Sequence, residues 1–220
     1  MQRLRLKFGC GEEVKFISHL DTMRFWERAF RRAEMPLAYS EGFSPHPRIS
    51  VAAPLAVGVT SGAELMDIWL KRWMPPQSVM MVARGQLPPG FAVFDAREVG
   101  LTLPSLQSCL AFAEYRVEVG SEESEQWVRD SIHSLLQTRE LPWQHSRGSG
   151  KIHFYDLRAL IDSLWLIHCR DSLCILGMRL QCNSSGSGRP EQVTAALGFS
   201  LAPESIHRTG LVLKGMSAPL

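Results

Sequence analysis

The sequence has no apolar run long enough to cross a membrane. A spanning helix needs about 18 consecutive apolar residues, and the apolar runs in these 220 residues fall well short of that length. The first residues also lack the cationic and apolar leader that is typical of a secreted protein. We therefore expect a cytoplasmic protein with no membrane partner.

Cysteine is scarce, with five copies in the chain. The number is odd and no two cysteines form a CxxC pair. This pattern favours reduced, mostly buried thiols over a disulfide framework. The five residues are Cys10, Cys109, Cys169, Cys174 and Cys182.

The motifs of common metal and hydrolytic sites are also missing. None of the seven histidines stands in an HxH or HxxxH pair, the spacings that direct two imidazoles at one metal ion. The chain contains neither GxSxG nor GxxxxGK[ST], which disfavours hydrolases and nucleoside triphosphatases. We expect no metal and no cofactor.

The overall composition is that of an ordinary folded protein, with 45% apolar and 21% charged residues. A net charge of +2 does not by itself indicate a nucleic-acid-binding protein. The charge is uneven, because residues 1–104 carry 13 basic and 10 acidic side chains against 11 and 12 in the remainder. Any basic surface must therefore be local.

Residues 16–54 combine a helix start, a helix with sorted charges and an irregular polar loop. Ser18 and Asp21 have the spacing of a capping box, which predicts a helix that begins at about His19. At about 100° per residue, its apolar residues share one arc and its arginines share the opposite arc. Pro36 predicts the end of the helix. The apolar arc contains Met23, Trp26, Ala29, Phe30 and Ala33, and the basic arc contains Arg24, Arg28, Arg31 and Arg32.

The loop at residues 41–48 reads EGFSPHPR. Its two prolines remove two backbone donors and stiffen the path, while its glycine permits a turn. Phe43, Ser44, His46 and Arg48 supply a ring, a hydroxyl, an imidazole and a guanidinium within six residues. A stiff loop holds such groups ready for a ligand. The alternative is an irregular connection with Phe43 tucked into the core.

The order of the expected elements indicates an α+β protein. In each half the order strand, helix, strand, strand, helix, strand is that of a ferredoxin-like (βαββαβ) domain with an antiparallel sheet. We predict tandem ferredoxin-like domains over residues 1–104 and 105–220, with a linker at 103–106; the first carries the basic helix and the proline-rich loop. The main expected strands are 3–8, 49–53, 66–71, 91–99, 112–119, 141–147, 173–180 and 209–214, and the main expected helices are 19–34, 75–86, 121–137 and 189–197.

The first of these strands has a basic face. Arg3, Arg5 and Lys7 alternate with three apolar residues, which is the period of a half-buried strand.

RNA or another polyanion is the ligand that suits the basic arc and the loop. Aromatic stacking beside guanidinium groups is typical of proteins that bind single-stranded RNA. Arg189, which follows a Gly-Ser-Gly loop at a helix start, and Arg208 are candidates for a second phosphate contact from the other half. The alternative is a solvated helix face on which Asp21, Glu27 and Glu34 pair with the arginines.

His19 and His46 are the candidate catalytic residues, as a general acid or base. An imidazole titrates near neutral pH, and a nearby arginine stabilises a developing phosphate anion. The alternative for both is a side chain hydrogen-bonded to the backbone.

Several stretches resemble one bacterial family. They are KFISHLD at 15–21, the arginine-rich helix, PLAYSEGFSPHPRIS at 36–50, PLAVGV at 54–59 and IHRTGL at 206–211. Together they are similar to the uncharacterised radical-SAM-associated (radical-SAM-linked) proteins. The resemblance implies a partner, a radical SAM protein with a cobalamin-binding region, and supplies neither an activity nor catalytic residues. This chain lacks the tight three-cysteine run of radical SAM enzymes, so we expect the companion and not the radical enzyme.

We therefore interpret the chain as an accessory protein, more consistent with a non-enzyme, that presents a substrate such as RNA to a radical SAM partner. The alternatives are a metal-independent RNA-processing enzyme and a protein-interaction scaffold with no ligand of its own.

Overall fold

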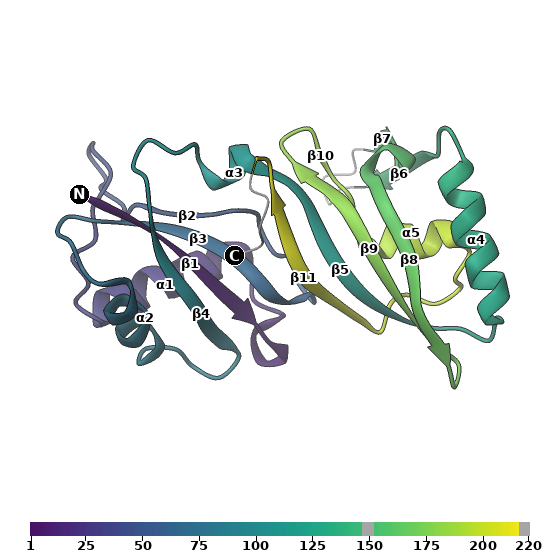
Figure 1. Cartoon of the computed structure of the whole chain (residues 1–220), viewed down its shortest axis with the longest axis horizontal. Coiled ribbons are helices and arrows are strands. Elements are labelled where there is room, and N and C mark those ends of the chain that lie inside the picture. The colour runs from purple at the N-terminus through teal and green to yellow at the C-terminus, as the bar shows by residue number, and fades with distance from the viewer. Residues whose placement is uncertain (147–151, 216–220) are drawn as a thin grey trace. The chain divides into compact units, whose positions relative to one another are not determined.

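The computed structural model describes residues 1–146 and 152–215 (Figure 1). The chain forms two compact units. Unit 1 comprises Met1–Leu110 and Arg208–Leu220, and unit 2 comprises Ala111–His207. Both are built on antiparallel strands, so the protein is α+β with a large antiparallel sheet and few helices. No helix in the described ranges is long and apolar enough to span a membrane.

Unit 1 has the strand order β4-β1-β3-β2. Helix α1 connects β1 to β2, and α2 connects β3 to β4. Each neighbouring pair of strands is antiparallel. The elements are β1 (Gln2–Cys10), the 3-10 turn η1 (Glu12–Val14), α1 (His19–Arg32), β2 (Ile49–Val51), β3 (Thr60–Leu70), α2 (Pro76–Arg84), β4 (Phe91–Val99) and α3 (Leu106–Cys109).

The core of unit 1 lies between one face of this sheet and the two helices. Leu4, Leu6 and Phe8 of β1 point to this face because side chains alternate along a strand. Trp26 of α1 is fully buried against them, with its ring 5.1 Å from that of Phe8 in an edge-to-face contact. Val79 of α2 belongs to the same cluster, so both helices cover one face.

Helix α1 confirms the helix predicted from the capping box. The Ser18 hydroxyl accepts a hydrogen bond from the Asp21 backbone N–H at 3.2 Å. The apolar arc is turned to the core, where Trp26, Ala29 and Phe30 are buried. The helix ends at Arg32, shortly before Pro36, the residue from which the end of the helix was predicted.

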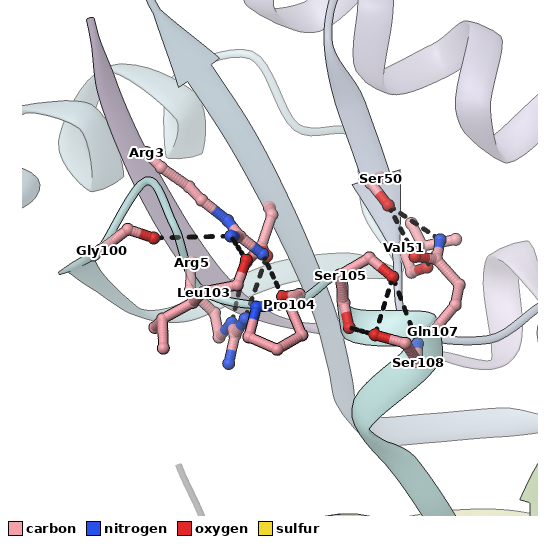
Figure 2. A network of polar contacts seen from close by, with 11 residues as sticks. Arg3, Arg5, Ser50, Val51, Gly100, Leu103, Pro104, Ser105, Gln107 and Ser108 are labelled. Carbon is pink, nitrogen blue, oxygen red and sulfur yellow. Dashed lines mark hydrogen bonds and ion pairs between the residues drawn. The ribbon is translucent and has the colours of Figure 1, made fainter.

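The opposite face of the sheet carries a buried cluster of charges (Figure 2). Arg3 Nη2 lies 2.6 Å from Asp67 Oδ2, and Arg5 Nε lies 2.8 Å from Asp67 Oδ1. Arg3 also donates to the backbone carbonyls of Leu103 and Pro104. The basic face predicted for the first strand is therefore used inside the molecule for Arg3 and Arg5.

The segment predicted as a linker is held to unit 1. Besides the bonds from Arg3, the Gln107 side chain donates to Ser50 Oγ at 2.8 Å and to the Val51 carbonyl (Figure 2). Helix α3 thus adjoins β2 instead of hanging free.

The strand β11 (Ser205–Leu213) brings the chain back to unit 1. Arg208 Nη1 lies 3.0 Å from Glu64 Oε1, and both side chains are almost fully buried. Arg208 also donates to the Pro54 carbonyl at 3.1 Å and accepts from Ser61 through its own carbonyl at 3.2 Å. A contact across 144 residues therefore completes the first unit.

Unit 2 has the strand order β8-β9-β5, and β11, of which residues 205–207 belong to this unit, follows β5 in the strand order. Helix α4 follows β5, α5 precedes β11, and a separate β6–β7 hairpin lies between α4 and β8. Residue 147 of the predicted extended stretch 141–147 lies outside the described residues. The elements are β5 (Leu110–Gly120), α4 (Glu125–Gln137), β6 (Pro142–Ser146), β7 (Ile152–Asp156), the 3-10 turn η2 (Arg158–Leu160), β8 (Ile161–Arg170), β9 (Leu173–Asn183), β10 (Gly186–Ser187) and α5 (Pro190–Leu197).

One cysteine expectation is wrong. Cys169 and Cys174 form a disulfide, because the β8–β9 hairpin places them directly opposite each other, with their Cα atoms 4.1 Å apart. Spacing along the chain did not indicate this pair. Cys10, Cys109 and Cys182 are free thiols.

Candidate nucleic-acid interface

The four arginines of the basic arc are all exposed on the outer face of α1. They recur at positions three or four residues apart, so they form one stripe along the helix. We call this set, Arg24, Arg28, Arg31 and Arg32, the α1 stripe.

Neighbouring acids neutralise little of the α1 stripe. Arg24 Nη1 lies 3.3 Å from Asp21 Oδ1. Within residues 1–146 and 152–215, no carboxylate lies within 4.0 Å of the other three guanidiniums, so the expected pairing with Glu27 and Glu34 does not form. The helix face therefore keeps most of its positive charge.

The contacts that the stripe makes inside the protein are to neutral groups. Arg28 Nε donates to the Arg24 carbonyl at 3.2 Å. Arg32 donates to the Gln86 side-chain oxygen at 3.1 Å and to its carbonyl at 3.2 Å. These bonds orient the guanidiniums without cancelling their charge.

Asp21 is the acid that does pair, and its main partner is the helix cap. The Ser18 hydroxyl donates to its carboxylate at 2.7 Å, and this bond lowers the pKa of Asp21. Arg24 and Arg28 lower the pKa further by smaller amounts. Asp21 is therefore ionised at neutral pH.

The loop is fixed at its base and exposed at its tip. The Ser40 N–H donates to the His46 carbonyl at 2.8 Å, and the His46 N–H donates to Ser40 Oγ at 3.0 Å. Phe43 has a relative exposure of 110%, and Ser44 and the His46 side chain are also exposed. Phe43 is not tucked into the core, and its ring is open to solvent on both faces.

Arg48 does not join the α1 stripe. Its guanidinium lies over the Trp69 ring, 4.9 Å from the ring centroid. Trp69 stands between the core residues Ile68 and Leu70 in β3, so its side chain points to the sheet face opposite α1. Arg48 therefore does not extend the basic arc of α1, because the sheet separates it from the helix.

The aromatic surface around Arg48 was missed. Trp69 also lies 5.0 Å from the Arg3 guanidinium, and the Lys71 ammonium lies 5.5 Å from the Tyr39 ring. Trp73 is 62% exposed. The sequence signal was WLKRW at 69–73, in which two tryptophans flank two basic residues.

The two candidate catalytic histidines lie far apart. His19 lines a pocket of about 20 Å³ beside Cys10, at the end of β1. His46 closes the loop whose Arg48 contacts Met1 at the start of the same strand. Gln2 and Cys10 are eight residues apart, or roughly 26 Å at about 3.3 Å per residue. The two imidazoles therefore do not share one reacting centre.

The pocket beside His19 also contains the thiol of Cys10, which stays protonated at neutral pH. Burial, with a smaller contribution from the nearby Glu64 carboxylate, raises the pKa of Cys10 to about 12. Its space is about that of a single water molecule. Within the described ranges, no group of three or more His, Cys, Asp or Glu side chains is placed to hold a metal ion.

The two arginines of the second half that were predicted to contact phosphate lie in different environments. Arg208 is buried and paired with Glu64, which removes it from any surface for phosphate. Arg189 stands directly before α5 in unit 2, is half-exposed, and lines a larger pocket.

Comparison with solved structures finds matches to chains of two complexes. A chain in the crystal structure of a Cbf5-Nop10-Gar1 complex aligns with a TM-score of 0.51 and 8% identity, over 94% of this chain and 48% of that one. A chain of an archaeal box H/ACA sRNP Nop10-Cbf5 complex aligns with a TM-score of 0.47 and 9% identity, over 94% and 46%. The chain spans about half the length of these solved chains, and the first likeness shows a similar fold alone.

Comparison with curated proteins gives no significant match. A family model, in contrast, matches residues 3–190, which is most of the chain and includes the capped helix, the loop and Arg189. This protein therefore belongs to the family described as "Uncharacterized protein conserved in bacteria" (DUF2344).

Proposed function

We propose that the protein binds single-stranded RNA through the α1 stripe. The observation that carries the proposal is the set of four exposed guanidiniums on one helix face, three of them without a carboxylate partner. Each arginine that neutralises a phosphate releases a condensed counterion, which favours binding at low salt. A helix face with several uncompensated charges gains the free energy of counterion release without a further rearrangement of the protein.

Phe43 adds a contact of a different kind. A fully exposed phenylalanine on a loop with a fixed base offers a face on which an unpaired base stacks. The stacking does not depend on base identity, so the interface favours single strands with little sequence preference.

The test is fluorescence anisotropy of a labelled single-stranded oligoribonucleotide against the full chain at several salt concentrations. Four phosphate contacts give a log–log slope of about −3, from roughly −0.7 per contact. The double variant Arg28→Gln/Arg31→Gln is expected to weaken binding and to flatten the slope by about 1.4.

The matched control is Arg129→Gln/Arg139→Gln, which removes two exposed arginines from unit 2 and changes the net charge equally. It is expected to keep the wild-type slope. If both double variants behave alike, or if the wild type does not bind RNA at low salt, α1 is only a solvated face and the scaffold alternative takes over.

We further propose that RNA binding serves a radical SAM partner with a cobalamin-binding region, to which this accessory chain presents the substrate. The support is the resemblance of the four stretches and the arginine-rich helix to radical-SAM-associated proteins. The check is co-purification of the tagged chain, from its native host, with a radical SAM protein that has a cobalamin-binding region. Two proteins that elute separately at micromolar concentration, with and without RNA, would refute the partnership.

RNA processing by this chain alone has less support, because His19 and His46 lie at opposite ends of β1. Incubation of the purified protein with total RNA, without added metal, separates the two functions. Discrete RNA products that disappear in His46→Ala or His19→Ala would support the alternative that this protein is an RNA-processing enzyme.

We also propose that each unit is a ferredoxin-like domain. The support is the shared order of elements and the strand orders β4-β1-β3-β2 and β11-β5-β9-β8. The predicted domain limits, 1–104 and 105–220, are tested by expressing the first piece alone. A fragment 1–104 that folds as stably as the same residues in the full chain would support those limits, although it lacks Arg208 and α3.

A further inference from the structure

Unit 2 contains a pocket that the α1 stripe does not use. It encloses about 360 Å³, which is within the range of small-ligand sites. Three elements of the unit meet there, namely β7, the β10 turn and the start of α5. The residues that matter for its chemistry are His153, Phe154, Tyr155, Gly186, Arg189 and Gln192.

One side chain in this pocket is buried and only half satisfied. Gln192 is 7% exposed, and its Oε1 accepts a hydrogen bond from Tyr155 Oη at 2.5 Å. Its Nε2 has no hydrogen-bond partner among residues 1–146 and 152–215. Nε2 is not among the fully buried polar atoms without a partner, so this donor is open to the pocket and can bond to a ligand.

The Tyr155 hydroxyl fixes the orientation of this amide. Burial raises the pKa of Tyr155, so the hydroxyl is protonated at neutral pH and keeps donating to Gln192. Its own lone pair stays available as an acceptor. The pair therefore presents an amide donor and a hydroxyl acceptor side by side.

Two further groups flank this polar pair. Phe154 of β7 is 77% exposed and lies at the edge of the pocket, with its ring on the opposite face of the strand from Tyr155. Arg189 gives it a guanidinium, whose nearest carboxylate, Glu191, is 3.8 Å away and beyond hydrogen-bond distance. The acid that lines the pocket, Asp156, already accepts from the Leu141 and Arg158 N–H groups.

We propose that this pocket binds one nucleotide. The base enters the pocket, the Gln192 amide and the Tyr155 hydroxyl contact its polar edge, and Arg189 pairs with the phosphate. A donor–acceptor pair and a guanidinium are the groups that a base edge and a phosphate require. A free mononucleotide and a nucleotide splayed from an RNA strand share this chemistry.

The proposal is independent of the α1 stripe, and the experiment keeps the two apart. The full chain is titrated calorimetrically with AMP, GMP, CMP and UMP, with the corresponding nucleosides, and with inorganic phosphate. We expect at least one mononucleotide to bind, more tightly than its nucleoside and than phosphate. Arg28→Gln/Arg31→Gln is expected to leave this binding unchanged.

Variants of the pocket assign the contacts. Gln192→Leu is expected to weaken the bound mononucleotide at least tenfold, and Tyr155→Phe, which removes a single hydroxyl, several-fold. Arg189→Gln is expected to abolish the preference for the nucleotide over the nucleoside. Thermal melts show which variants remain folded, and Tyr155→Phe keeps the test valid if Gln192→Leu does not fold.

A short single-stranded oligoribonucleotide distinguishes the two sources of nucleotide. If the pocket takes a base from RNA, Gln192→Leu weakens the oligoribonucleotide as well as the mononucleotide; if it takes free nucleotides, only the mononucleotide weakens. The proposal is overturned if no mononucleotide binds at millimolar concentration, if phosphate binds as tightly, or if the pocket variants bind like the wild type.

Discussion

The arginines of unit 1 fall into two regions that the sequence presents alike. In β1 and β11, Arg3, Arg5 and Arg208 are buried, and each faces a buried carboxylate. On the outer face of α1 the arginines are exposed, and among the described residues only Arg24 has a carboxylate within 4.0 Å. The difference shows that a basic stripe becomes a binding surface only when the fold leaves it uncovered and uncompensated.

The buried region uses its charges for stability within the unit. Asp67 holds two arginines at once, and one of them also fixes the backbone of residues 103 and 104. Burying charges in this way is costly unless each one is paired. These arginines therefore have little to offer a phosphate, whatever their number in the sequence.

The largest effect in this comparison is expected from Asp67→Asn. The change keeps the volume but leaves Arg3 and Arg5 without the carboxylate that they share, which costs about 3–5 kcal/mol. Urea denaturation measures the loss. The matched control is Asp95→Asn, which breaks the exposed pair with Arg97 and is expected to cost less than about 1 kcal/mol. Equal losses of stability in the two variants would show that the buried cluster stabilises unit 1 no more than an exposed ion pair does.

Glu64→Gln is expected to cost about 3 kcal/mol, at the lower end of the range for a broken buried pair. The reason for the smaller effect is that the Pro54 carbonyl continues to accept from Arg208. Denaturation with urea again measures the change, and limited proteolysis is expected to cut the C-terminal strand first. A variant with unchanged stability would mean that the pair does not hold residues 208–213 to unit 1.

Phe43→Ala tests the exposed region of unit 1 instead of the buried arginines. Because Phe43 has no packing to lose, the free energy of unfolding is expected to stay within about 0.5 kcal/mol of the wild type. RNA affinity is expected to fall by about 1–3 kcal/mol from lost stacking, with the salt slope unchanged. A flatter slope would assign the effect to charge and not to stacking.

Ser18→Ala is expected to cost about 1 kcal/mol of stability, from loss of the helix cap. Part of the loss depends on pH. Ser18 lowers the pKa of Asp21 in the folded protein, so this stabilisation is present above the unfolded pKa and is lost as the pH falls through the folded one. Denaturation curves at pH 7 and below about pH 4 are expected to show the difference between variant and wild type narrowing. A difference that widens in acid would contradict this assignment.

The sequence predicted the elements whose signals are local. The capping box placed the start of α1 at His19, the wheel separated its apolar and basic arcs, and the alternation of side chains indicated the strands β1 and β3. These patterns succeed because a helix cap and a strand period are set by residues a few positions apart.

Contacts between distant residues were decided by the tertiary structure alone. No residue close to Arg208 in the sequence indicates that its side chain is buried against Glu64, which is 144 residues away. Likewise, the sheet places Arg48 beside Trp69 and away from α1, and the β8–β9 hairpin joins Cys169 to Cys174. The sequence determined by itself which residues carry charge and which helix face is basic. Only the fold decided which charges are buried with a partner and which stay in water, because burial and pairing depend on what the rest of the chain packs against them.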